Sequence, residues 1–84
     1  MAWRLAWEDH SWSEDDVTVA DAVIVSELLE RDDWRVMEPT ASPRACVAWL
    51  SVLLARKAGV SIEEAQAAVM ARPFRFLVDA LTIE

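Results

Sequence analysis

The sequence has little of what small catalytic or metal-binding sites usually need. It contains one glycine, one cysteine and one histidine among 84 residues. A single glycine excludes a glycine-rich phosphate loop. A single cysteine excludes an intrachain disulfide, and no Cys/His cluster exists for a structural metal. We therefore expect no cofactor, no metal and no enzymatic activity.

Basic residues are also scarce, and they are unevenly distributed. Eight Lys and Arg residues stand against fifteen Asp and Glu residues, a net charge of −7. Residues 1–42 carry eleven acidic and three basic side chains, a net charge of −8, whereas residues 43–84 carry four and five, a net charge of +1. Nucleic acids and anionic membranes both select positively charged surfaces. We expect neither as a partner; the acidic half suits solubility or a basic protein partner.

We expect neither a membrane-spanning helix nor an export signal. The longest apolar run covers residues 45–55, with Ser51 as its only polar residue, whereas a bilayer-spanning helix needs about 20 residues. The first ten residues lack the basic start and apolar core of a signal peptide. The expected location is the cytoplasm, and 84 residues suffice for a single domain over residues 1–84.

The apolar run itself predicts a central buried helix. Ser42 is suited to the N-cap, and Pro43 to the first helical turn. Gly59 is suited to the left-handed position after the last turn. Apolar residues occupy nearly all sides of the segment between them, so the rest of the chain is expected to surround it.

The start of the chain has the periodicity of a β-strand. Residues 2–8 alternate, with Trp3, Leu5 and Trp7 on one side and smaller or polar side chains on the other, the pattern of a half-buried strand. Asp9 and His10 could turn the chain so that residues 11–13 pair back as a hairpin. The alternative is one short strand followed by a loop.

A helix is predicted over residues 19–30. Thr18 and Asp21 resemble a capping box, although the β-branched residues 23–25 leave a strand as a competitor. The residues that this helix would bury are Val19, Ala22, Val25 and Leu29.

Two shorter helices are predicted after Gly59. Ser61 and Glu64 form a capping box for a helix over residues 62–71, and Pro73 can begin another. The face that the last helix would bury is Phe74, Leu77, Val78 and Leu81, at the i, i+3, i+4, i+7 spacing.

The segment over residues 31–41 separates the first two predicted helices and is expected to be irregular, because Pro39 blocks helix continuation. Trp34 and Val36 or Met37 are expected to point inward. The predicted fold class is α+β: mainly α-helical, with three to four helices and a short N-terminal strand or β-hairpin.

Two side chains could be taken for catalytic groups. His10 lies in a polar turn beside carboxylates, but no nucleophile or further nitrogen or sulfur ligand is near it in the sequence. Cys46 lies in the apolar run, where burial raises the pKa of a thiol and makes it inert. We interpret them as a turn residue and a core residue.

Tryptophan is unusually frequent, with five residues. Trp49 belongs to the central helix, and the other four either cover the helices with a thin sheet or remain exposed as anchors for a partner. Acidic pairs accompany them and could bind a basic surface. The candidate partner-binding residues are Trp3, Trp7, Trp12, Trp34, Asp15, Asp16, Asp32 and Asp33.

The order of these features resembles a known family. Trp12 precedes the acidic stretch 15–18 (DDVT), and Trp34 precedes Pro39 by five positions. An apolar helix and two shorter helices follow. In this order the chain resembles small tail assembly chaperones of long-tailed bacteriophages, especially those of actinobacterial hosts. It departs from them at residues 31–33 and at His10, where glycines would be expected.

The resemblance implies a non-enzymatic protein that acts in the infected cell. Such chaperones bind the helical tape-measure protein, help to recruit tail-tube subunits around it, and often form homo-oligomers. The acidic first half also permits a different hypothesis, an inhibitor that mimics DNA and occupies a basic nucleic-acid-binding protein surface.

Overall fold

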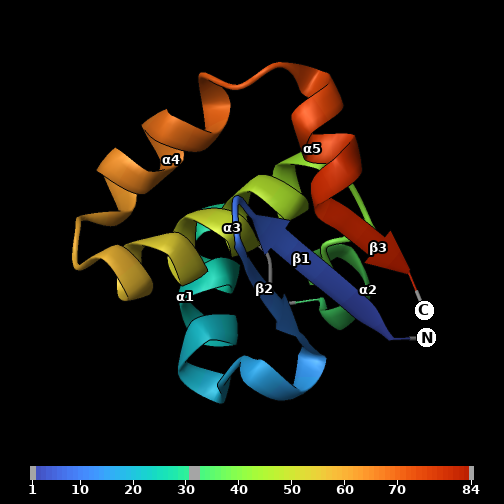
Figure 1. Cartoon of the computed structure of the whole chain (residues 1–84). Coiled ribbons are helices and arrows are strands. Elements are labelled where there is room, and N and C mark those ends of the chain that lie inside the picture. The colour runs from blue at the N-terminus through green and yellow to red at the C-terminus, as the bar shows by residue number, and fades with distance from the viewer. Residues whose placement is uncertain (1, 31–32, 84) are drawn as a thin grey trace.

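The computed structural model describes residues 2–30 and 33–83, except for the side chains of Trp34 and Val36, and it shows the predicted α+β, mainly helical fold (Figure 1). A short antiparallel sheet lies against a set of helices. In chain order the elements are β1 (Trp3–Trp7), β2 (His10–Ser13), the 3-10 helix η1 (Glu14–Asp16), α1 (Val19–Leu29), α2 (Trp34–Met37), α3 (Pro43–Ala58), α4 (Ile62–Met70), α5 (Phe74–Ala80) and β3 (Leu81–Ile83).

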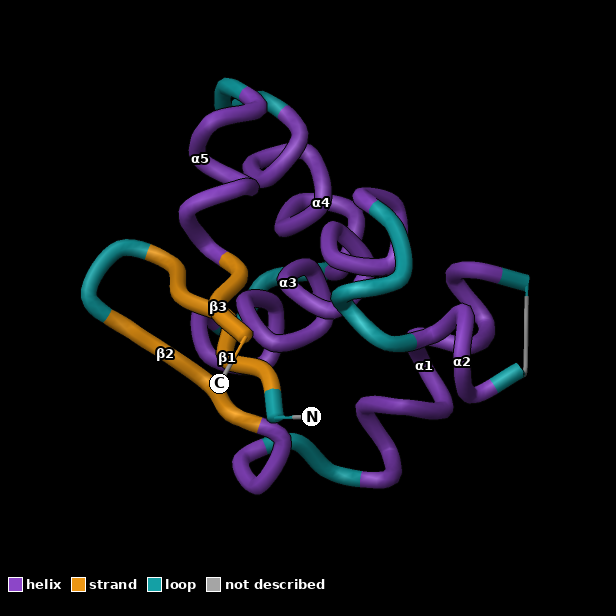
Figure 2. Tube along the Cα trace, turned by 90° about the vertical axis from the view of Figure 1, so that its right-hand side faces the viewer, coloured by secondary structure: helices purple, strands orange, loops and turns teal. Residues whose placement is uncertain are grey.

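Helix α3 is the centre of the fold, as its apolar run predicts. It contacts α1, α4, α5 and β1. Figure 2 shows the sheet on one side of α3 and α1 on the other. Trp49, Leu50 and Leu53 are buried, and Val47 is half-buried. Surrounding elements therefore cover α3 along most of its length.

The ends of α3 follow the predicted capping chemistry. The Ser42 hydroxyl accepts a hydrogen bond from the Ala45 N–H over 3.1 Å, and Pro43 is the first helical residue. Gly59 ends the helix with φ +70°, the left-handed conformation that glycine adopts without strain. Both boundaries are encoded locally, within three residues of each end.

The N-terminal hairpin forms, but its turn lies one residue earlier than predicted. Trp7 pairs with His10, so Glu8 and Asp9 make the turn and His10 belongs to β2. Glu8 takes the positive φ (55°) that such a short turn requires. The resulting register places Trp12 opposite Leu5, on the face of the sheet that covers α3.

Strand β3 was not predicted. It pairs antiparallel with β1 and makes a three-stranded sheet of order β2-β1-β3. The predicted last helix was expected to include Leu81, but α5 ends at Ala80 and Leu81 is paired with Leu5. A strand of three residues is too short to show the two-residue alternation of a β-strand. Leu81 also fits the helical spacing that begins at Phe74, so the sequence favoured a helix here.

Helix α1 confirms the predicted capping box and corrects the predicted buried face. The Thr18 N–H donates to Asp21 Oδ2 over 2.9 Å, and the Asp21 N–H donates to Thr18 Oγ1 over 3.2 Å. Val25 and Leu29 are buried, but Val19 is 82% exposed and the buried residue of the first turn is Asp21. The carboxylate is buried because it also binds the guanidinium of Arg56.

Within the predicted irregular connection, the described residues 33–41 contain a further helical turn. Residues 34–37 form the single turn α2, and Asp33 is its N-cap. Trp49 anchors this turn, because its Nε1 donates to the Met37 carbonyl over 2.6 Å. The predicted inward orientation of Trp34 and Val36 falls outside the described side chains.

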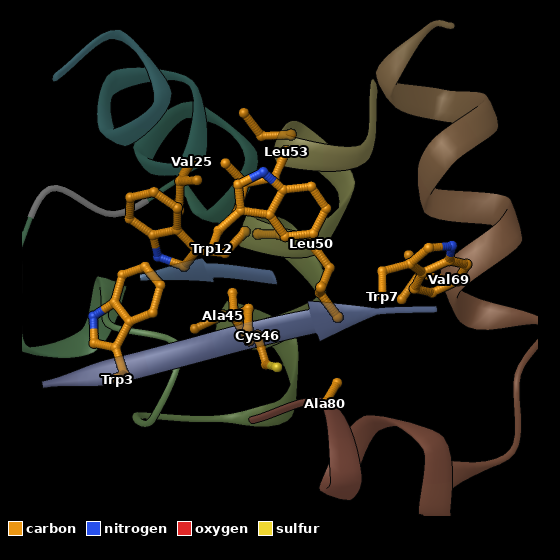
Figure 3. Packing of buried hydrophobic residues seen from close by; sticks show 14 of the residues in the cluster. Trp3, Trp7, Trp12, Val25, Ala45, Cys46, Leu50, Leu53, Val69 and Ala80 are labelled. Atoms are coloured by element: carbon orange, nitrogen blue, oxygen red, sulfur yellow. The ribbon is translucent and has the colours of Figure 1, made fainter. Parts of the chain in front are cut away.

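One hydrophobic core joins the sheet to the helices. Trp3 and Trp12 point from the sheet into the core around α3, where the rings of Trp3 and Trp49 lie 5.6 Å apart, and Trp7 lies beside Val69 of α4 (Figure 3). The other large contributors to this core are Leu5, Val25, Leu29, Leu50, Val52, Leu53 and Val69.

Candidate protein-binding surface

Three of the four predicted partner-binding tryptophans are buried. Trp3, Trp7 and Trp12 are 5%, 6% and 9% exposed and belong to the core. This is the arrangement in which the indoles cover the helices. A partner could contact these rings only after the sheet had moved away. The side chain of Trp34 and all of Asp32 lie outside the described residues.

The described acidic residues of the predicted partner-binding set lie at the surface. Two of them, Asp16 and Asp33, accept hydrogen bonds from neighbouring residues. Asp16 Oδ2 accepts hydrogen bonds from the Ser13 N–H over 2.9 Å and the Ser13 hydroxyl over 3.1 Å. The bond from the Ser13 N–H, and to a smaller extent the bond from the Ser13 hydroxyl, lower the pKa of Asp16 below its ordinary 3.8. Asp33 caps α2 by accepting from the Arg35 N–H. Asp15 is exposed in η1.

A second surface has the character of a binding site. It belongs to residues 43–84, whose net charge is only +1. Four large apolar side chains on α4, α5 and β3 are more than half exposed, and we call them the C-terminal apolar surface. They are Met70 (68%), Phe74 (69%), Val78 (51%) and Ile83 (53%). Isolated exposed apolar residues are ordinary, whereas a group on consecutive elements is typical of interaction sites.

Grooves lie on both sides of Phe74. One groove has a volume of about 350 Å³. Helix α5 and strand β3 form one wall, and residues 39–43, which lead into α3, form the other. The other, of about 230 Å³, lies between α5, the end of α4 and Val47 of α3. Phe74 and Leu77 line both grooves. Phe74 is therefore a ridge between two hollows, each of which could receive an apolar side chain.

A third groove continues this surface towards α1. It has a volume of about 410 Å³ and shares Val47 and Met70 with the groove beside it. Leu28 and Leu29 of α1 and Arg44 of α3 complete its walls. The three grooves follow one another across the N-terminal half of α3, so a partner could contact them in sequence.

Charge at this surface differs from that of the acidic first half. Arg44 and Arg72 line the grooves and are exposed. Arg75 is exposed on α5, next to Phe74 in the chain, and Asp79 is the exposed acid on the same helix. Arg72 is held in place, because its Nη2 lies 3.1 Å from Glu8 Oε1 and its guanidinium carbon lies 4.9 Å from the Trp7 ring centre. A partner that buries apolar side chains here meets arginine donors at its margins.

Sequence reasoning missed this surface because it assigned two of its residues to the core. Phe74 and Val78 were predicted to face inward, but α5 instead turns Phe76, Leu77 and Ala80 towards the protein. The Phe76 ring meets the Trp7 ring edge to face at 4.9 Å. The spacing 76, 77, 80 is as helical as 74, 77, 78, so periodicity could not distinguish the two faces.

The two side chains considered for catalysis lie in different elements, His10 in β2 and Cys46 in α3. Burial raises the pKa of the Cys46 thiol from its ordinary 9.0 to about 11, although Cys46 forms part of the wall of the groove of about 350 Å³ beside α5. His10 Nε2 lies 3.4 Å from Asp9 Oδ1. Within residues 2–30 and 33–83 no three His, Cys, Asp or Glu side chains are grouped so that they could hold a metal ion.

Comparison with known proteins adds no relative. No protein-family model matches this chain, and no curated protein or solved structure matches it either. No helix in the described part of the chain is long and apolar enough to cross a membrane.

Proposed function

We propose that this chain is a non-enzymatic tail assembly chaperone of a long-tailed bacteriophage, acting in the cytoplasm of the host bacterium. It would bind the tape-measure protein and help to recruit tail-tube subunits around it. Two independent considerations support the proposal. The first is the resemblance in the order of Trp12, the DDVT stretch, Trp34, Pro39 and the helices that follow. The second is the C-terminal apolar surface.

The observation that carries the proposal is the exposure of Phe74 between two grooves. An amphipathic helix presents apolar side chains about one turn apart, which can enter neighbouring hollows. Binding of this kind would cover the apolar face of a tape-measure helix before the tail tube encloses it. The ring of Phe74 supplies a large apolar area at a low cost in side-chain entropy, as anchor residues do.

The charges around the grooves indicate which helices fit best. Arg44 and Arg75 would pair with acidic residues that flank the apolar face of a bound helix. The described acidic residues of the first half of the chain do not line these grooves, and they would keep the complex soluble. The preferred client is therefore an amphipathic helix with acidic margins.

The direct test is co-expression with the tape-measure protein. Phe74→Ser should abolish co-purification, or weaken it about tenfold or more, because it removes the ridge between the grooves. Val19→Ser is the matched control, since Val19 is an exposed apolar residue of α1 outside the three grooves. It should leave co-purification unchanged.

The proposal is wrong if the unmodified chain neither co-purifies with the tape-measure protein nor changes its solubility. If binding occurs but Phe74→Ser and Val19→Ser weaken it equally, the surface is wrong although the function stands. Circular dichroism of both variants checks that each remains folded.

The acidic surface supports a second candidate function, a DNA-mimic inhibitor of a basic nucleic-acid-binding protein. Glu14, Asp15 and Asp16 are consecutive and exposed in η1, and Asp33 is exposed at the start of α2. This function predicts salt-sensitive binding to a basic protein and competition with DNA. Charge reversal at Asp15, Asp16, Asp32 and Asp33 should abolish that binding, whereas tape-measure binding through Phe74 should survive it.

A further inference from the structure

The two edges of the sheet are protected to different degrees. The β2 edge carries His10 and two serines and continues into the acidic turn η1. The β3 edge reads Leu81-Thr82-Ile83 and carries no charged residue. Natural sheets usually protect exposed edges with charges, prolines or bulges. The β3 edge has none of these within its three residues.

The outer side of β3 is also without a hydrogen-bonded neighbour in the described part of the chain. β3 pairs with β1 through Leu81–Leu5, Thr82–Arg4 and Ile83–Trp3. The backbone hydrogen bonds among described residues outside the helices and strands do not involve β3. Figure 2 shows β3 on the side of the molecule that faces the viewer, away from α1 and α2.

The apolar layer of the protein continues past this edge. Leu81 and Ile83 lie opposite Leu5 and Trp3 and therefore share the face of the sheet that covers α3. Both line the groove of about 350 Å³ beside α5, whereas Thr82 does not. An added strand with apolar residues on this face would extend the core into the groove.

We propose that a second copy of this chain supplies that strand, by antiparallel pairing of the two β3 strands about a two-fold axis at Thr82. The polarity of Leu81-Thr82-Ile83 is the same in both directions, so the strand complements itself. Leu81 of each copy lies opposite Ile83 of the second copy, and the two Thr82 residues face each other. The product is a continuous sheet of twice the three strands of one copy.

This pairing fills the groove with residues already suited to it. Ile83, 53% exposed in the single chain, would enter the groove of the second copy beside Leu81 and Val78. Apolar cross-strand pairs and Thr–Thr pairs both stabilise antiparallel sheets. The contact uses the same patch on both copies and therefore closes at two subunits.

The net charge of −7 on each copy opposes the association. Salt screens this repulsion, because the Debye length falls to a few ångströms at high ionic strength. The dimer should therefore be tighter in about 0.5 M NaCl than in dilute buffer. An association through ion pairs would show the opposite dependence.

Sedimentation equilibrium of the purified chain tests the proposal without any client. The unmodified chain should show a monomer–dimer equilibrium that shifts towards dimer at high salt. Ile83→Lys places a charge on the apolar face of the edge and should raise the dissociation constant about tenfold or more. Val19→Lys adds the same charge at an exposed position of α1 and should have little effect.

Crosslinking locates the contact. Thr82→Cys should be joined to its counterpart by a short bis-maleimide, whereas Ser11→Cys, on the opposite edge of the sheet, should not. Cys46 is buried and should not react in either variant. A chain that remains monomeric at all concentrations and salt levels overturns the proposal. So does a dimer that Ile83→Lys leaves intact, or one that Ser11→Cys crosslinks as well as Thr82→Cys. These results do not depend on tape-measure binding.

Discussion

Arg56 Nη1 donates a hydrogen bond to Asp21 Oδ2 over 2.6 Å and ties the last turn of α3 to the first turn of α1. The two residues are 35 positions apart in the chain. Asp21 is 4% exposed, and its Oδ2 also accepts from the Thr18 N–H. One carboxylate oxygen therefore caps a helix and holds two helices together.

The first prediction concerns this ion pair. Arg56→Ala should lower the free energy of unfolding by about 2–3 kcal/mol, because it leaves the buried Asp21 carboxylate without its charged donor. Lys57→Ala is the control, since Lys57 is exposed in the same helical turn and should change stability by no more than about 0.5 kcal/mol. Urea denaturation measures both. Equal effects of the two substitutions would contradict a structural role for the pair.

The second prediction distinguishes the two phenylalanines of α5. Phe76→Ala should destabilise the protein by about 2 kcal/mol, because the half-buried ring packs edge to face on Trp7. Phe74→Ala should change stability by less than about 0.5 kcal/mol, because its ring is mostly exposed. Thermal unfolding compares them directly. The reverse order of effects would restore the face predicted from periodicity.

The third prediction uses the raised pKa of Cys46, about 11 against an ordinary 9.0. The folded state holds the thiol proton more tightly than the unfolded state, so this contribution to stability is complete below pH 9 and is lost as the pH rises through 11. Between pH 9 and pH 11 the free energy of unfolding of the unmodified chain should therefore fall more than that of Cys46→Ala. The difference between the two falls should be about 2–3 kcal/mol at most. Urea titrations at several pH values provide the comparison. Parallel pH profiles for the two proteins would show that the thiol keeps its ordinary pKa.

The fourth prediction concerns Asp16, whose pKa is lowered by the two hydrogen bonds from Ser13. Ser13→Ala removes the hydroxyl donor and leaves the backbone donor, so the pKa of Asp16 should rise part of the way towards its ordinary value. Carboxyl NMR titration measures the change, with Asp15 as an internal reference. Because the folded pKa is lowered, the associated stability is present above the ordinary value and is lost as the pH falls through the folded pKa. An unchanged Asp16 titration in Ser13→Ala would assign the effect to the backbone bond.

Local chemistry explains which parts of the fold could be predicted. The caps at Thr18, Ser42, Ser61 and Gly59 each act within three residues of a helix end. Their side chains need no distant partner to form the turn. The helices α1, α3 and α4 were therefore predicted to within a residue or two of their observed ends.

The candidate site could not be predicted in the same way. Its ridge, Phe74, was assigned to the core because the sequence around it permits two helical faces. The choice between them depends on the contact of α5 with Trp7 and on the pairing of β3 with β1. Trp7 and β1 are more than 60 positions away from α5 and β3 in the chain. The tryptophans were recognised as important, but their burial depended on the packing of their face of the sheet against the helices, which the sequence pattern does not show.

What the sequence determined by itself is a mainly helical fold with an acidic first half and a buried central helix, because composition, caps and an apolar run act locally. Tertiary structure decided which face of α5 meets solvent, that Asp21 binds Arg56, and that residues 81–83 close the sheet instead of extending a helix. Each of these depends on contacts between distant segments, whose free energies exceed the small differences in local preference that the sequence pattern records.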